Sequence, residues 1–210
     1  MRSTRSRLAA LLLAGGILTP ALALAASWTE LGDAGELPGS AQITAGTGSL
    51  TQIVGSLPTD NDVDMYCIRV NDRASFFAFR TCAAISEPDL WLFDQNGNGV
   101  ELNDGCMFGQ TNLTAPLVPV NGLYYLAISL SDRDARAPLN LNIWQPPFVS
   151  SPRAPDGPGA PGPIQAWGGS PFPLGPVNYT IQLGGATFCD IPVPIDGATW
   201  GHVKTRFVEP

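Results

Sequence analysis

The chain has 210 residues, of which 18 are acidic and 11 are lysine or arginine, so its formal net charge at pH 7 is −7. Such a chain repels phosphate backbones and anionic lipid surfaces, which argues against nucleic acid as a partner and favours cations. The 23 glycines and 20 prolines predict many turns and little helix, and the length suits one folded domain.

Residues 1–26 have the pattern of a secretory signal peptide. Three arginines precede an apolar run at residues 8–18, and small residues lead to a cleavage point expected after Ala25 or Ala26. A membrane anchor is the alternative, but this run is too short to span a bilayer, and no later segment is long enough. Removal of the signal peptide changes the formal charge from −7 to −10. We therefore expect an exported domain at residues 27–190, followed by a C-terminal tail at 191–210.

Runs with a two-residue apolar period predict β-strands, because alternate side chains of a strand point to opposite faces of its sheet. At 64–70, for example, Tyr66, Ile68 and Val70 share one face. The predicted strands lie at residues 50–57, 64–70, 75–80, 89–94, 98–102, 123–130, 139–144 and 178–184. Their spacing predicts an all-β fold, a two-sheet antiparallel β-sandwich of the jelly-roll type.

Two of these strands carry specific expectations about which residues face inward. Phe77 and Phe79 share one face of the strand at 75–80. In the strand at 139–144, Leu139, Leu141 and Ile143 are expected in the core, and the asparagines between them are expected in solvent.

The turn after the strand at 89–94 invites comparison with an EF-hand. Asp94, Asn96 and Asn98 have the spacing of the first EF-hand ligands, but Gly105 stands where a bidentate glutamate is needed, and the flanking segments are strands. Asn96 followed by Gly97 is instead typical of a tight hairpin. We therefore predict a plain turn.

A Pro/Gly-rich segment at 145–177 interrupts the strand pattern, and we interpret it as a long inserted loop. Trp167 and Phe172 lie in this loop. They either pack onto the sandwich or are offered to a partner. The tail at 191–210 contains the single histidine, His202, and is expected to dock on the sheet.

Four aspartates are predicted to gather at one end of the sandwich. If the strands alternate in direction, Asp62 and Asp64 begin one strand, Asp89 begins another, and Asp104 ends a hairpin at the same end. Calcium takes six to eight oxygen ligands, so these carboxylates predict a calcium site at this rim. The alternative is that they are solvated loop acids.

The four cysteines predict two disulfides, because an exported chain with an even number of cysteines commonly oxidises them. Cys82 and Cys106 are expected at the same end of the sandwich, which leaves Cys67 to pair with Cys189. Free thiols are the alternative. A zinc site is disfavoured, because there is no C-x-x-C pair.

Three stretches, TDNDVDMYCIRV at 59–70, DLWLFDQNGNGVELND at 89–104 and GLYYLAIS at 122–129, resemble the bacterial pre-peptidase C-terminal domain. That family is a small secreted β-sandwich that is often appended to exported proteases. The resemblance implies a non-catalytic binding or stabilising role, and relatives of this type can carry calcium. The chain departs from the family in having Asn103 before Asp104 where an acidic pair is usual, in the long Pro/Gly-rich insertion, and in having no attached catalytic domain.

The sequence offers little for catalysis. His202 is the single imidazole, and neither a G-x-S-x-G nor an H-E-x-x-H motif occurs. We expect an exported, non-catalytic protein that binds a protein or polysaccharide at the bacterial cell surface, or supports the envelope. The alternatives are a carbohydrate-active hydrolase that uses paired carboxylates of the acidic rim, and a structural component of an extracellular matrix.

Overall fold

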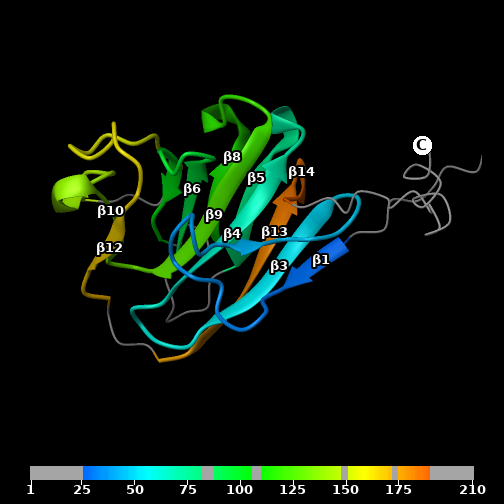
Figure 1. Cartoon of the computed structure of the whole chain (residues 1–210), viewed down its shortest axis with the longest axis horizontal. Coiled ribbons are helices and arrows are strands. Elements are labelled where there is room, and N and C mark those ends of the chain that lie inside the picture. Colours follow the sequence, from blue (N-terminus) through cyan, green and yellow to red (C-terminus); the bar gives the residue numbers. More distant parts are fainter. Residues whose placement is uncertain (1–25, 82–87, 106–109, 148–150, 172–174, 190–210) are drawn as a thin grey trace, which may run out of the picture.

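A computed structural model of the chain describes residues 26–81, 88–105, 110–147, 151–171 and 175–189. Over these residues the chain forms an all-β sandwich of two stacked sheets, as the sequence predicts (Figure 1). Helix is limited there to three short 3-10 turns, at Arg73–Ser75, Ala115–Leu117 and Pro138–Asn140. None of the helices in the described part is long and apolar enough to cross a membrane.

Two main sheets and one small sheet contain the strands. Sheet A has the order β1 (Ala26–Thr29), β3 (Leu50–Leu57), β13 (Val177–Gly184), β5 (Phe77–Thr81) and β8 (Gln110–Thr114). Sheet B has the order β14 (Ala186–Phe188), β4 (Val63–Val70), β9 (Gly122–Leu130), β6 (Pro88–Asp94) and β7 (Gly99–Asn103), with β2 (Gln42–Ile43) also beside β4. The small sheet has the order β11 (Leu141–Asn142), β10 (Arg133–Ala137) and β12 (Ala166–Gly169).

Most described strand pairs are antiparallel, and the two parallel pairs both involve the N-terminal segment. β1 runs parallel to β3 at the edge of sheet A, and β2 runs parallel to β4 at the edge of sheet B. The side chain of Gln42 links these strands, because its Oε1 accepts from Trp28 Nε1 at 2.7 Å. The N-terminal segment therefore contacts both sheets.

The inner core lies between the two sheets. Tyr66, Ile68 and Val70 of β4 face it together, as their spacing predicts, and they meet Tyr179 and Ile181 of β13 from sheet A. Burying an aliphatic side chain of this kind contributes about 1.5–3 kcal/mol, so the alternating pattern is the main stabilising feature of the fold.

An outer core covers the other face of sheet B. Trp91 and Phe93 of β6 point away from sheet A and pack edge-on against Trp144 and Trp167, with ring centroids 5.3–6.2 Å apart. Trp167 thus packs onto the sandwich, whereas Phe172 lies outside the described residues. The outer core explains why the 89–94 run is apolar on both faces.

The strand predicted at 139–144 is wrong over most of its length. Leu139 and Asn140 have positive φ angles, Leu139 is 89% exposed, and only the two-residue β11 follows. Of the three residues expected in the core, Leu139, Leu141 and Ile143, only Ile143 is buried, and it lies in the outer core. Apolar alternation in the sequence did not reveal this turn.

β5 shows a different departure from the expected pattern. Phe77 and Phe79 do share one face, but it is the outer face of sheet A, and Phe77 is partly exposed. Ala78 and Arg80 point into the interior instead. Aromatic residues alone therefore did not identify the core face of this strand.

The turn at 94–99 is the plain hairpin that the sequence predicts. Asp94 Oδ1 accepts the backbone N–H groups of Asn96 and Asn98 at 2.8 and 2.9 Å, and Gly97 has a φ of +82°. The Asp94 carboxylate is therefore used within its own turn.

Cys67 and Cys189 form a disulfide, with Cα atoms 5.4 Å apart, which confirms this predicted pairing. The bond ties β4 to the chain just after β14. The other predicted pair, Cys82 with Cys106, lies outside the described residues.

Candidate metal centre

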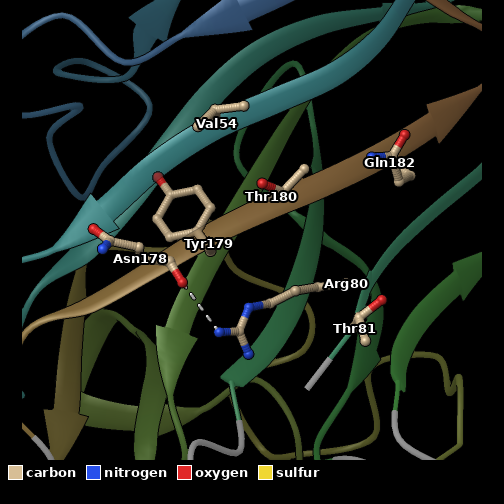
Figure 2. A pocket seen from close by; sticks show the side chains of 7 residues that line it. All are labelled: Val54, Arg80, Thr81, Asn178, Tyr179, Thr180 and Gln182. Atoms are coloured by element: carbon tan, nitrogen blue, oxygen red, sulfur yellow. Dashed lines mark hydrogen bonds between the residues drawn. The ribbon is translucent and has the colours of Figure 1, made fainter. Parts of the chain in front are cut away.

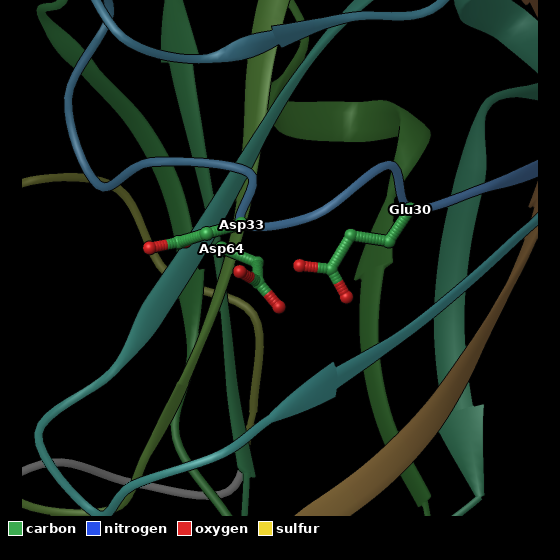
Figure 3. Close-up of side chains that lie close together, drawn as sticks. All are labelled: Glu30, Asp33 and Asp64. Atoms are coloured by element: carbon green, nitrogen blue, oxygen red, sulfur yellow. The ribbon is translucent and has the colours of Figure 1, made fainter.

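Three carboxylates from separate parts of the chain meet near the edge of the sandwich. Glu30 follows β1, Asp33 lies in the loop between β1 and β2, and Asp64 lies on β4. Each offers an oxygen, and these three oxygens lie within 4.8 Å of one another. Figure 3 shows the carboxylates of Glu30 and Asp64 turned toward each other, with Asp33 beside them.

Backbone contacts hold the two N-terminal acids in place. Glu30 N donates to Val54 O, and Glu30 Oε2 accepts from Ser56 N, both at 2.8 Å. Asp33 Oδ1 accepts from Gly35 N at 3.2 Å in a short turn. Gly35 has a φ of +64°, which favours glycine at this position. Both acids are therefore positioned by β3 and by the turn rather than by each other.

Asp64 is the buried member of the group. Its side chain is fully inaccessible, and its Oδ2 accepts a 2.5 Å hydrogen bond from the Tyr179 hydroxyl. The Tyr179 hydroxyl in turn lies 2.5 Å from that of Tyr66. Asp64 Oδ1 is buried as well and has no hydrogen-bond partner among the described residues. A buried acceptor without a partner is costly, so this oxygen calls for a ligand or a proton.

The pKa values of Asp64 and of the neighbouring Asp62 are raised. Burial is the largest cause that raises the pKa of Asp64, and together with the charges of Glu30, Asp62 and Asp33 it brings this pKa to about 8, against the lowering effect of the Tyr179 hydrogen bond. Burial and the charge of Asp33 likewise raise the pKa of Asp62 to about 6. A bound cation would reverse this balance by favouring the ionised carboxylates.

The donor set fits a hard divalent cation. All three candidate ligands are carboxylate oxygens, which calcium and magnesium prefer, and the group contains no histidine or cysteine that would favour zinc. Calcium tolerates six to eight oxygens in flexible geometry, so carbonyls, water or a ligand would supply the remaining positions. The orphaned Oδ1 of Asp64 meets the first requirement of such a site, a buried oxygen with no competing donor.

The four aspartates predicted to form one site fall into two groups. Asp62 and Asp64 lie with Glu30 and Asp33, whereas Asp89 lies beside Asp104. The predicted common end is correct, because Asp64 pairs with Ile128 and Asp89 with the adjacent Ser129 on β9.

The two groups are separated by the sheet itself. Asp64 shares the face of Tyr66 in the inner core, and Asp89 shares the face of Trp91 in the outer core. A single site built from Asp62, Asp64, Asp89 and Asp104 therefore does not match the arrangement of the side chains, because β4, β9 and β6 stand between them.

Asp89 occupies a different environment from Asp64. It is fully buried, and its Oδ1 accepts from Gly105 N at 3.1 Å. Burial raises the pKa of Asp89 well above its usual value, and the neighbouring Asp104 carboxyl raises it further. This pair is therefore suited to holding a proton.

Sequence reasoning missed Glu30 and Asp33. They lie in an N-terminal segment with no clear strand pattern, and the parallel pairing of β1 with β3 brings them to β4. The acidic spacing in ELGD, residues 30–33, was the available signal, but pattern alone could not place it opposite Asp64.

A second pocket, of about 390 Å³, lies beside β13 and β5. Figure 2 shows the Arg80 guanidinium reaching toward Asn178, whose backbone oxygen accepts from Arg80 at 3.4 Å. Arg80 is the single charged group among the described residues that line it, which are Val54, Arg80, Thr81, Asn178, Tyr179, Thr180 and Gln182. Burial lowers the pKa of Arg80. No carboxylate is among the described residues that line this pocket, in contrast to the metal centre.

Comparison with known proteins adds no relative: no protein-family model matches the chain, and a search of curated proteins finds no match.

Proposed function

We propose that the chain is an exported, non-catalytic binding protein of the bacterial cell surface or envelope, and that calcium stabilises it at Glu30, Asp33 and Asp64. The observation that carries the calcium site is the meeting of three carboxylates, of which the buried Asp64 has an oxygen, Oδ1, without a hydrogen-bond partner among the described residues. The partner would be a protein or a polysaccharide, and the resemblance to the pre-peptidase C-terminal domain supports the same role.

Two features support export. The N-terminal sequence has the pattern of a signal peptide, and cleavage after Ala25 or Ala26 would start the mature chain at β1. The Cys67–Cys189 disulfide fits an oxidising compartment, where such bonds form and persist.

Calcium would join parts of the chain that are distant in sequence. Glu30 and Asp33 belong to the N-terminal segment, and Asp64 belongs to sheet B. A cation held by all three would neutralise their repulsion and tie this segment to β4. It would supply structural charge only, and the chain's own residues would perform the binding.

Calcium titration followed by thermal unfolding tests the site. A ligand that binds only the folded state at 100 times its Kd adds about 2.7 kcal/mol, which raises the Tm by about 5–10 °C for a domain of this size. We expect this rise in the wild-type protein and its loss in Asp64→Asn, which keeps the shape but removes the charge.

Asp89→Asn is the matched control, because it removes a buried aspartate on the opposite face of the same sheet. It should retain the full calcium response. An equal calcium response in wild type and Asp64→Asn would rule out the proposed centre, and so would the absence of any response in wild type.

A further inference from the structure

The outer face of sheet A, which points away from sheet B, has no charged side chain at the described outward-facing positions of β3, β13 and β5. These positions alternate with the buried ones and hold amides, hydroxyls, valine, glycine and phenylalanine. The chain as a whole is acidic, with a formal net charge of −7. An uncharged face on an acidic protein suits a neutral ligand better than an ionic one.

One row of this face crosses four strands in register. Gln182 of β13 pairs with Gln52 of β3 on one side and with Phe79 of β5 on the other. Phe79 pairs in turn with Asn112 of β8. Paired residues of neighbouring strands place their side chains on the same face, about 5 Å apart. Each amide offers two N–H donors and an acceptor, which complement the hydroxyl groups of a ligand.

Two aromatic rings lie beside each other on the same face. The ring centroids of Phe77 and Phe79 are 5.9 Å apart, and the ring planes are 31° from parallel. The Phe77 ring leans over Gly184 of β13, where a Cβ atom would overlap it, and Phe77 remains 40% exposed. The C–H groups of a sugar ring pack well on such rings, because an aromatic face is electron-rich.

The pocket of about 390 Å³ borders this face. Thr180 and Gln182 of β13 and Thr81 of β5 line it, and all three occupy outward-facing positions (Figure 2). Its volume is near the lower end of the range for small-molecule sites. Because Gln182 belongs to both, the pocket continues the row of amides toward the end of β5.

The face is too small for a stable protein–protein interface. β5 and β8 have five residues each, and four strands of this length, spaced about 5 Å apart, cover roughly 330 Å². Specific protein complexes bury about 800 Å² on each partner. A polysaccharide is a narrow chain that can lie across the strands, so this area is sufficient for it.

We propose that the outer face of sheet A binds a neutral polysaccharide. One sugar ring stacks on Phe77 and Phe79, and hydroxyl groups of the neighbouring units bond to the amides of Gln182 and Asn112 and enter the pocket. This inference rests on the proposed binding role, to which it gives a surface and a ligand class. It does not depend on the calcium site.

The test uses the full mature chain with its disulfides intact. Galactomannan, xyloglucan and dextran serve as neutral probes, and hyaluronan serves as an acidic probe. Binding to the immobilised polymers is measured by surface plasmon resonance at pH 6, in excess calcium and in EGTA. We expect binding to at least one neutral probe, with affinities within about twofold in the two buffers, and binding to hyaluronan at least about tenfold weaker.

Four variants test the surface, and circular dichroism and thermal unfolding verify that each is folded. Phe77→Ala and Gln182→Ala should each weaken binding to the neutral probe about tenfold. Gly184→Ala keeps Phe77 but displaces its ring, so it should also weaken binding, which nonspecific apolar adsorption would not show. Val120→Ala is the matched control, because Val120 is 61% exposed and lies outside this face, and it should change nothing.

The inference is overturned if the wild-type protein binds no neutral probe, if Phe77→Ala binds as tightly as wild type, or if hyaluronan binds as tightly as the neutral probes. A dimer in sedimentation that Phe77→Ala converts to a monomer would assign the face to a second copy of the chain instead. None of these results affects the calcium titration. Conversely, a wild-type protein without a calcium response would lose the metal centre and keep the polysaccharide surface.

Discussion

The acidic groups around Asp64 and Asp89 lie at the same end of sheet B but on its opposite faces, and they differ in what surrounds them. Asp64 faces the inner core together with Glu30 and Asp33, and Asp33 is exposed to solvent. Asp89 faces the outer core beside Asp104 and accepts from Gly105 N. Two aspartates at neighbouring positions of one sheet therefore have different surroundings, because successive side chains of a strand point to opposite faces.

The two acidic groups also differ in their access to solvent. An exposed acid in the first group gives a cation a route from solvent, so ionised carboxylates can be neutralised by calcium. In the second group Asp89 is fully buried, and its neutral form is the favoured one. We interpret the first group as a cation site and the second as a site that holds a proton.

The largest expected effect is a pH dependence of the calcium-free protein. Folding raises the pKa of Asp64 to about 8, of Glu101 to about 7, and of Asp89 well above its usual value, in each case mainly through burial. The folded state therefore binds more protons than the unfolded state between about pH 4 and pH 8, and stability falls as pH rises through this window.

Urea unfolding between pH 5 and pH 8 in EGTA measures this effect. We expect the free energy of unfolding to fall by several kcal/mol toward pH 8. Excess calcium should restore part of the loss at pH 8, the part due to the Asp64 group. A free energy that stays constant or rises toward pH 8 without calcium would contradict the burial of these acids.

The next largest expected effect is a change in stability that has opposite signs in the two acidic groups when calcium is present. In EGTA at pH 8, both Asp64→Asn and Asp89→Asn should stabilise the protein, by about 2 kcal/mol each. The folded wild-type protein must either bury a charged carboxylate or take up a proton at this pH, and asparagine keeps an acceptor without either cost. In saturating calcium, Asp64→Asn should become less stable than wild type, whereas Asp89→Asn should stay more stable. Denaturation of the three proteins under both conditions gives the signs directly.

The sequence predicted the end of the sheet at which these aspartates lie, but not which of them lie next to one another. Two-residue periodicity located β4, β6 and β9 and their directions, which places Asp64 and Asp89 at one end. It did not assign either acid to a face of the sheet, so the four aspartates were expected to converge. The 89–94 run is apolar on both faces, so it gave no sign of which side Asp89 occupies.

The remaining misses have two physical causes, which are non-local contacts and one local turn. Glu30 and Asp33 reach Asp64 only because β1 joins β3 in parallel. The outer core depends on Trp144, at the end of the wrongly predicted strand at 139–144, and on Trp167, from the Pro/Gly-rich segment. Leu139 fits an alternating pattern but takes a positive φ in a turn, which an apolar pattern does not encode. Local patterns located most strands of the two main sheets, and contacts between distant segments brought the acids together.

A smaller effect concerns the hydroxyl that contacts Asp64. Tyr179 donates to Asp64 Oδ2 and lies within hydrogen-bond distance of the Tyr66 hydroxyl. Tyr179→Phe should cost about 1–3 kcal/mol, because it leaves buried polar groups without their partner. Tyr66→Phe should cost less, because the bond between Tyr179 and Asp64 is kept. Chemical denaturation in EGTA at pH 7 compares the two variants. An equal loss of unfolding free energy would show that the bond between Tyr179 and Asp64 stabilises the protein no more than the bond between the two tyrosines.

Tyr179→Phe also affects the pH at which calcium binds. The Tyr179 hydrogen bond lowers the pKa of Asp64, so its removal raises that pKa. Protons then compete with calcium up to a higher pH. Calorimetric titrations at several pH values should show the onset of calcium binding moved upward in Tyr179→Phe and unmoved in Asp89→Asn.

The smallest expected effect tests the burial of an acid that belongs to neither acidic group. Glu101 of β7 is fully buried, and its Oε1 accepts from Thr114 N at 2.8 Å. Burial raises its pKa to about 7, against the lowering effect of the bonds from Thr114. Glutamine keeps the acceptor without the charge, so Glu101→Gln should stabilise the protein at pH 8 by about 1 kcal/mol.

The stabilisation by Glu101→Gln should be smaller at pH 5. At this pH Glu101 is protonated in the folded wild-type protein, and taking up that proton costs little free energy. Calcium should not change the gain, since Glu101 is not a member of the clustered carboxylates. Urea unfolding at both pH values, with and without calcium, measures it. A gain that depended on calcium would mean that the cation acts through the whole sheet, and the separation of the two faces would then not explain the difference between Asp64 and Asp89.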